Sequence, residues 1–281
     1  MRYATGFVLL GLGLALATPT LAASPRAGTP GSVLATEDTL HTEVPPVLVH
    51  AARVTLDEIL DRVARGEARR DSAMQDQSFL ATVRMIGHSD EAAPRVLLER
   101  VARVYRKRPG RVRTVPLRER DDRPKAMRDD GPGAGASMNE DIVDFAFDPA
   151  ARARYRYRIA AREVVGDRVV YRLAFEPRST LDPGQPSGLV WVDTRDFVIV
   201  RQELTFRESP VPLFMKGIRR MVIERRRVDE HWMLARVLIR IESAFPFPGL
   251  GRMFDFAIAH DDITVNTGLP DSLFVGTGVT R

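Results

Sequence analysis

The chain contains no cysteine among its 281 residues. Disulfide bonds therefore contribute nothing to its stability, and no lipid can be attached through a cysteine near the N-terminus. Hydrophobic residues make up 44% of the chain and charged residues 28%, which is typical of a globular protein with one large or two small domains. The stability has to come from the burial of a hydrophobic core.

Sequence motifs of the common enzyme classes are absent as well. The chain has no Gly-x-Ser-x-Gly, no His-Glu-x-x-His, no Walker loop and no Gly-x-Gly-x-x-Gly between a strand and a helix. Its five histidines include no pair at i, i+4 spacing, which would place two metal ligands on one helix face. We therefore predict that the protein is not an enzyme and has no catalytic residues, no metal and no cofactor.

The most site-like cluster of residues is His260-Asp261-Asp262. The apolar residues of the surrounding run, 254–265, change faces at this cluster. A β-bulge or a bend explains the change without a ligand, so we expect a bulge or a bend here.

Lysine is scarce in this basic protein. Only Lys107, Lys125 and Lys216 are lysines, so arginine supplies nearly all of the 42 basic residues. The formal net charge of +5 is spread over the polar faces of the predicted strands. We interpret this charge as a solvated outer face, with attraction to an anionic membrane surface as the alternative, and expect no nucleic-acid partner.

Residues 1–22 have the pattern of a secretory signal peptide. Arg2 stands near the start, an uncharged apolar run follows at 7–17, and small residues near Ala22 offer a cleavage site. The apolar run is well short of the roughly 20 residues that cross a bilayer, which argues against a membrane anchor. The sequence therefore predicts a soluble periplasmic protein that begins with a flexible tether at 23–53, rich in Pro, Thr, Ala and Gly.

Alternating apolar and polar residues indicate a series of β-strands in the second half of the chain. The clearest strand is 232–245, where the even positions include Arg236 and Arg240 and six odd positions are apolar, namely Met233, Ala235, Val237, Ile239, Ile241 and Phe245. Short turns such as Gly166-Asp167 join consecutive strands, which is typical of antiparallel hairpins. The sequence therefore predicts a mainly β (α+β) fold with a strongly curved antiparallel sheet.

A helix is predicted to begin at the start of this domain. Thr55 and Glu58 have the spacing of a capping box. The apolar stripe that follows consists of Leu56, Ile59, Leu60 and Val63. We expect this stripe to pack on the concave face of the sheet as a lid, with the helix weakened at Gly66.

The rest of the chain completes a single predicted domain, 54–267. The runs 79–87 and 96–107 read as a first hairpin, and a polar excursion with several glycines follows at 116–140. Residues 268–281 form a C-terminal tail.

The concave side of the sheet is predicted to be a hydrophobic hollow. Its lining residues are the apolar members of the alternating runs, namely Tyr155, Tyr157, Val169, Tyr171, Leu173, Phe175, Val198, Val200, Leu204, Phe206, Val237, Ile239 and Ile241. One helix cannot bury them all, and at roughly 25 cal/mol per Å² the exposure of such a face to water is costly. The face must be covered by apolar loops, by a second sheet or by a lipid.

Two segments, 210–215 and 245–254, carry large apolar residues beside prolines, where hydrophilic turn residues are the default. They either fold back over the sheet as core plugs or form a hydrophobic rim at the mouth of the hollow. The residues of such a rim are Leu213, Phe214, Phe247 and Leu250.

The segment 188–193 (GLVWVD), followed after a short turn by 197–204 (FVIVRQEL), resembles the outer-membrane lipoprotein-sorting carriers of the LolA and LolB type. In that family these two strands lie in the middle of an incomplete β-barrel whose hydrophobic hollow, covered by helices, holds lipoprotein acyl chains. The resemblance extends over 55–266 in the order of elements and implies the same fold and ligand class here. The excursion and the tether depart from the family pattern, so docking to the usual partners of the family is not implied.

A weaker likeness is to the periplasmic segments of uncharacterised outer-membrane surface proteins. It rests on Phe175-Glu176-Pro177, on the strand 188–193 and on Trp232 at a turn. This second likeness concerns the fold more than the function.

Three functional hypotheses follow. The first is an exported carrier or binder of lipid or lipoprotein acyl chains in the cell envelope, with a wide hollow between helix and sheet. The second is a protein-interaction or sensor module of the same fold, whose edge strands or tether bind partners such as envelope membrane proteins. The third is an enzyme, which requires a cleft with convergent polar residues of perturbed pKa.

Overall fold

The computed structural model describes residues 54–89, 93–125, 146–179, 185–208 and 215–275. The predicted signal peptide and tether lie outside the described residues, as do Leu213 and Phe214 of the predicted rim. Within the described segments, no helix combines the length and the apolar character that crossing a membrane requires.

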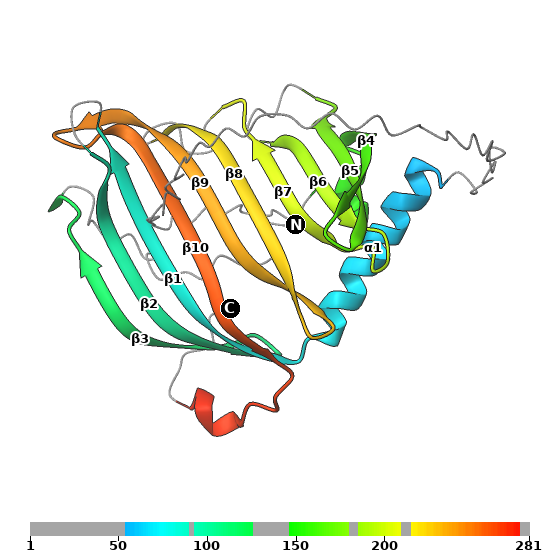
Figure 1. Cartoon of the computed structure of the whole chain (residues 1–281), viewed down its shortest axis with the longest axis horizontal. Coiled ribbons are helices and arrows are strands. Elements are labelled where there is room, and N and C mark those ends of the chain that lie inside the picture. Colours follow the sequence, from blue (N-terminus) through cyan, green and yellow to red (C-terminus); the bar gives the residue numbers. More distant parts are fainter. Residues whose placement is uncertain (1–53, 90–92, 126–145, 180–184, 209–214, 276–281) are drawn as a thin grey trace, which may run out of the picture. The chain divides into compact units, whose positions relative to one another are not determined.

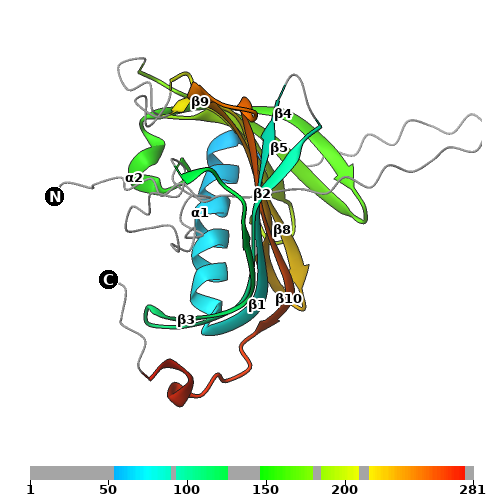
Figure 2. The same ribbon diagram turned by 90° about the vertical axis from the view of Figure 1, so that its left-hand side faces the viewer.

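Ten antiparallel strands form one sheet with the order β3-β2-β1-β10-β9-β8-β7-β6-β5-β4 (Figure 1). The strands are β1 (Asp76–His88), β2 (Arg95–Lys107), β3 (Arg111–Asp121), β4 (Tyr155–Val165), β5 (Arg168–Pro177), β6 (Ser187–Asp193), β7 (Ile199–Thr205), β8 (Met215–Val228), β9 (His231–Phe247) and β10 (Gly251–Val265). The sheet is strongly curved (Figure 2) and does not close, because β3 and β4 lie at opposite ends of the strand order. The predicted mainly β fold with a curved antiparallel sheet is confirmed.

The centre of the sheet is made by a long-range pairing. Strands β4 to β10 follow one another as a meander, as the hairpin signals predict, and β10 then pairs with β1, with Val83 opposite Ile258. The early hairpin of β1 and β2 therefore joins the sheet beside its last strand. The period-two pattern identifies a strand but not its neighbour, so this pairing is absent from the sequence prediction.

After β2 the chain forms a further strand, β3, that was not predicted. Strand β3 extends to Asp121, so 116–121, the first part of the predicted polar excursion, is strand. None of the β3 side chains is fully buried, and an edge strand that covers no core needs no apolar face. Residues 126–145 of the excursion lie outside the described residues.

Helix α1 (Leu56–Ala73) lies on the concave side of the sheet (Figure 2). The hydroxyl of Thr55 caps it as predicted and accepts a hydrogen bond from the N–H of Glu58 at 3.2 Å. Three members of the apolar stripe are buried, namely Ile59, Leu60 and Val63. The helix continues past Gly66 to Ala73.

Gly66 is the point where α1 comes closest to the sheet. A Cβ atom at this position would lie 2.7 Å from the carbonyl oxygen of Asp196 and nearer still to that of Phe197. Only glycine allows the helix backbone to approach the β6–β7 turn this closely. A residue that is unfavourable for an isolated helix is thus required by the packing.

Glu67 anchors the helix by polar contacts. Its carboxylate accepts hydrogen bonds from the N–H of Ile199 and from Nη1 of Arg225, both at 2.7 Å. The Arg70 guanidinium approaches the same carboxylate at 3.2 Å. The side chains of Glu67, Arg70 and Arg225 are all more than nine-tenths buried. We refer to these three residues as the Glu67 cluster.

Strand β7 differs from its prediction. We expected one face to contain Val198, Val200, Leu204 and Phe206. The register shifts between Trp191 and Val192 of β6, and the buried residues of β7 are Ile199, Gln202 and Leu204, with Val200 only half-buried. A bulge adds one residue to the strand and so breaks the period of two on which the prediction rested.

Candidate functional site

A pocket of about 410 Å³ opens where the N-terminal half of α1 meets edge strand β4 and the short helix α2 (Pro149–Arg152). Its lining residues are Leu56, Asp57, Leu60, Pro149, Arg152, Ala153, Tyr155, Tyr157 and Arg178. Leucine, proline and tyrosine supply the apolar surface, and the arginines and the aspartate supply the charged groups. The volume lies in the range of about 300–1,000 Å³ that small-molecule sites occupy.

Helix α2 positions one wall of this pocket. The carboxylate of Asp148 caps the helix and accepts a hydrogen bond from the N–H of Ala150 at 2.8 Å. Pro149 occupies the first turn, where its missing N–H costs nothing. The chain then turns into β4, so the first residues of that strand face the same space.

An aromatic cluster forms the sheet side of the pocket. The ring centroids of Phe147 and Tyr157 are 5.4 Å apart, those of Tyr155 and Phe175 are 5.8 Å apart, and Phe147 meets Phe175 edge-on at 5.7 Å. The Tyr157 hydroxyl donates a hydrogen bond to the carbonyl oxygen of Ala146. Burial raises the pKa of Tyr157 to about 12, so this wall carries no charge at neutral pH.

Arg152 connects α2 to α1 across the pocket. Its guanidinium lies 2.9 Å from a carboxylate oxygen of Asp57 and 2.5 Å from one of Asp61. The Asp57 side chain is 89% exposed and that of Asp61 55%, so these are surface ion pairs, each with a free energy of about 0–1 kcal/mol. The connection costs little to open.

The structure brings only some of the predicted site residues together. Tyr155 and Tyr157 of the predicted hollow and Leu56 and Leu60 of the predicted lid line the pocket. The other predicted hollow residues that are buried are Leu173, Phe175, Val198, Leu204, Val237 and Ile241. Those that are half-buried are Val169, Tyr171, Val200, Phe206 and Ile239. Their role in ligand binding stays a prediction.

The odd positions of β9 share a face with the core of neighbouring strands. Val237 stands opposite Ile223 of β8 and Ile258 of β10, and both of these residues are buried. The expected register of this strand is therefore the one observed at Val237.

The apolar segment 245–254 is mostly strand and turn. Strand β9 continues to Phe247, whose carbonyl accepts a hydrogen bond from the N–H of Leu250 at 2.9 Å, and β10 begins at Gly251. Leu250 is only 4% exposed and lies over Gly87. Of the two interpretations left open for this segment, Leu250 fits the core plug, whereas Phe247 is half-buried against the ring of Phe254.

Sequence reasoning missed five residues of the pocket lining, namely Asp57, Pro149, Arg152, Ala153 and Arg178. All but Asp57 stand before β4 or after β5, where no alternating pattern includes them. The sequence offered one signal, the pair Asp148-Pro149, which is typical of a helix start.

The predicted bulge at His260 is present. The β1–β10 register shifts between Ser78 and Leu80, and Asp262 has a positive φ of 49°. His260 stacks on Phe79 with centroids 4.0 Å apart, and burial lowers its pKa to about 3, which keeps the ring neutral. In the part of the chain that the structure describes, no group of His, Asp and Glu side chains could hold a metal ion.

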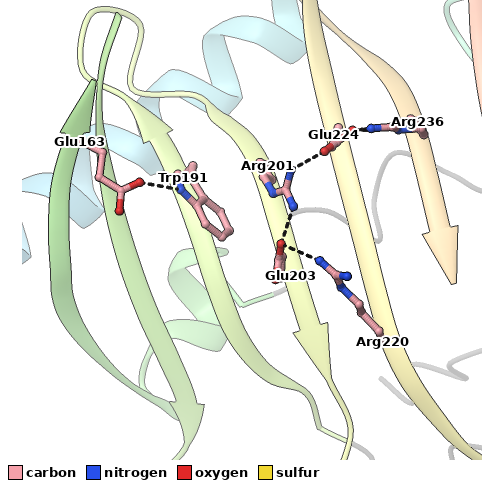
Figure 3. A network of polar contacts seen from close by, with 7 residues as sticks. All are labelled: Glu163, Trp191, Arg201, Glu203, Arg220, Glu224 and Arg236. Carbon is pink, nitrogen blue, oxygen red and sulfur yellow. Dashed lines mark hydrogen bonds and ion pairs between the residues drawn. The ribbon is translucent and has the colours of Figure 1, made fainter. Parts of the chain in front are cut away.

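The convex face of the sheet carries a network of ion pairs (Figure 3). Glu224 pairs with Arg201 at 2.5 Å and with Arg236 at 2.6 Å, and Glu203 pairs with Arg201 and Arg220. A shallow depression of about 250 Å³ lies among these side chains. Because arginines and carboxylates of neighbouring strands face one another, the charges within this network largely compensate each other.

No model of a known protein family matches the chain, and no curated protein matches it. Solved structures do. A DUF1329 family protein from Desulfovibrio piger is 16% identical, with a TM-score of 0.43 over 79% of this chain and 98% of that one. A putative outer membrane lipoprotein-sorting protein domain from Vibrio parahaemolyticus is 14% identical, with a TM-score of 0.37 over 79% of this chain and all of that one (100%). A LolA superfamily protein from Nitrosomonas europaea is 14% identical, with a TM-score of 0.30 over 79% of this chain and 97% of that one.

Proposed function

We propose that the protein is a non-enzymatic carrier or binder of lipid or lipoprotein acyl chains, exported to the periplasm by residues 1–22. The observation that carries the proposal is the pocket between α1, α2 and β4, where the predicted lid and the predicted hollow meet. Leu56, which is half-buried, offers an acyl chain an apolar surface there, beside the more deeply buried Leu60 and Tyr155. Each buried CH₂ group of such a chain contributes about 0.8 kcal/mol.

The surroundings of the pocket suit a ligand that enters and leaves. The neutral hydroxyl of Tyr157 presents no charge to an acyl chain, and the link between Arg152 and α1 opens at small cost. Arg178 stands at the same pocket and favours a ligand with an anionic head, whereas Arg152 already pairs with Asp57 and Asp61. An amphiphile with one acyl chain and an acidic head group combines both preferences.

The test is lipid extraction by the purified chain from vesicles of phosphatidylethanolamine and phosphatidylglycerol, read by native mass spectrometry. We expect Leu56→Asp to reduce the extracted lipid about tenfold, because a bound acyl chain would remove water from the new carboxylate at the pocket wall, which costs free energy. Leu56 is only half-buried, so the melting temperature should change little. The matched control is Leu117→Asp, which places the same change on β3, where Leu117 is 59% exposed.

Two results contradict the proposal. One is a parent chain that extracts no lipid under conditions in which it remains folded. The other is an equal loss of extraction in Leu56→Asp and Leu117→Asp, which means that the pocket has no special part in binding.

A further inference from the structure

Both edge strands of the sheet, β3 and β4, carry arginines, but the arginines of the two strands differ in their partners. At the β3 edge, arginines are engaged within the chain. Arg111 pairs with Asp271 at 2.9 Å, Arg118 pairs with Glu99 at 3.0 Å, and Arg113 donates a hydrogen bond to the carbonyl oxygen of Leu273 at 2.7 Å.

The β3 edge is also obstructed in other ways. Pro116 lies within the strand and removes one backbone donor from it. The short 3-10 helix η3 (Asp271–Phe274) supplies the carboxylate and the carbonyl that bind the β3 arginines. Proline within an edge strand and cover by a helix or loop are devices by which natural sheets prevent further strands from pairing with an edge.

The β4 edge is different. Arg156, Arg158 and Arg162 are exposed, and no ion pair holds any of them in the described part of the chain, although the Arg162 guanidinium lies 5.8 Å from the centroid of the Tyr171 ring. Glu176 stands opposite Arg156 in the ladder but makes no ion pair with it, and the only acidic residue of β4, Glu163, is bound by Arg172 at 2.8 Å.

Apolar groups are exposed on β4 as well. Ile159 is 42% exposed, Val164 74% and Val165 56%. No described strand pairs with the outer side of β4, so its backbone offers donors and acceptors for another strand. The edge therefore combines backbone groups, apolar side chains and unpaired positive charge.

Charge decides which strand this edge accepts. A second copy of the chain that paired β4 with β4 would bring arginines close to arginines, which is destabilising. Arg156 and Arg158 are two residues apart and lie on one face of the strand. An added strand with acidic residues at alternating positions places its carboxylates beside both of them.

We propose that β4 is a docking edge for an extended acidic segment of a partner protein, which adds a strand to the sheet by main-chain hydrogen bonds and pairs its alternate carboxylates with Arg156 and Arg158. This inference does not depend on lipid binding, because it uses the outer side of β4 and not the pocket.

The test uses the purified full chain and a fluorescent peptide of about eight alternating Glu and Val residues, within the usual length of a strand. Binding is measured by fluorescence anisotropy. The peptide controls are the same sequence with Lys in place of Glu, and a block peptide with all Glu residues before all Val residues.

Two double variants separate the edges. We expect Arg156→Glu with Arg158→Glu to weaken binding of the alternating peptide at least about tenfold, since two attractive charges become repulsive. The matched control, Arg118→Glu with Arg120→Glu, makes the same change of charge on β3 and should bind as the parent does. Circular dichroism confirms that both variants are folded.

Amide hydrogen exchange tests for strand addition itself. The alternating peptide should slow exchange in β4 and leave exchange in β3 unchanged, because new ladder bonds protect only the edge that receives them. Binding without protection of β4, equal binding of the block peptide, or equal effects of the two double variants would overturn the proposal.

Other occupants of the edge give other results. If the chain forms a dimer at the protein concentrations of the binding experiment, and the β4 double variant abolishes the dimer, the edge serves self-association and the proposal is overturned. If the parent binds phosphatidylglycerol vesicles but not the peptide, and the β4 double variant loses the vesicle binding, the edge binds a membrane surface and the proposal is also overturned. Leu56→Asp should bind the peptide normally, which distinguishes this inference from the proposed lipid function.

Discussion

The two halves of α1 are attached to the sheet by different forces. The N-terminal half packs through Ile59, Leu60 and Val63, which are buried apolar side chains. The C-terminal half is held by the close approach of Gly66 and by the Glu67 cluster. Apolar contacts are non-directional, whereas hydrogen bonds and backbone contacts fix distance and angle.

This difference has a functional consequence. The half with directional contacts is far from the pocket, and the half with non-directional contacts borders it through Leu56 and Leu60. We therefore expect α1 to move as a lid whose fixed end is the Glu67 cluster and whose moving end is Leu56. The following substitutions test this picture, in order of decreasing effect.

The largest effect is expected from Glu67→Ala. It leaves the Arg225 guanidinium and the Ile199 N–H buried without their carboxylate, and breaking a buried pair in this way costs about 3–5 kcal/mol. Urea denaturation measures the free energy of unfolding. The control is Glu58→Ala on the same helix, which removes only a half-exposed pair with Arg62. Equal losses in the two variants would show that the Glu67 cluster is no special anchor.

Gly66→Ala should have the next largest effect. Alanine favours helices over glycine by about 1 kcal/mol, yet its Cβ would collide with backbone oxygens of the β6–β7 turn, at a cost of about 1–3 kcal/mol or more. The control is Gly217→Ala, since a Cβ there meets nothing within 4 Å. A stabilised Gly66→Ala variant would mean that α1 shifts freely at this point, contrary to the assignment of its fixed end.

Tyr157→Phe should lower the free energy of unfolding by about 1 kcal/mol at neutral pH, because it removes the hydrogen bond to Ala146. It should also change the pH dependence. The folded pKa of about 12 exceeds the ordinary value, so the stabilising contribution of Tyr157 is complete below about pH 10 and is lost as the pH rises towards 12. Between these pH values the free energy of unfolding, obtained from denaturation curves, should fall less steeply with rising pH in the variant than in the parent. An unchanged slope would argue against a buried hydroxyl at the pocket.

The smallest effect on stability is expected from Arg152→Ala, at about 0–1 kcal/mol, since its partners are exposed. The substitution should change the rate of ligand release more than it changes stability, because it removes the link at the moving end of α1. Stopped-flow release of a fluorescent fatty acid should become faster. Arg65→Ala, an exposed arginine of the same helix, provides the control, and equal release rates in both variants would contradict the lid.

Local sequence signals predicted most elements of this fold, with β3 and α2 as the exceptions. The hydroxyl of Thr55 lies within three residues of the N–H that it caps, and the alternation of 232–245 appears as a strand with Val237 in the core. The two-residue turn at Gly166 also forms as predicted, with Val165 opposite Arg168. Caps, periods and turns depend on neighbouring residues, so a single sequence contains them.

The candidate site was predictable only in part. Leu56, Leu60, Tyr155 and Tyr157 were found because they belong to apolar periods. Arg178 could not be found, because its place at the pocket depends on the pairing of β5 with β4, and its own neighbours form no pattern.

The sequence by itself determined helix α1 and most of the strands, though not β3 or α2, because those choices depend on backbone propensity and on periodic burial within each segment. Only the tertiary structure decided that β10 pairs with β1, that Gly66 is a contact and not a weakness, and that the Glu67 carboxylate meets Arg225. Each of these depends on two segments more than a hundred residues apart in the chain, and their complementarity exists only once the sheet has formed. The unpaired arginines of β4 belong to the same class, since pairing is a property of the neighbours that the fold supplies.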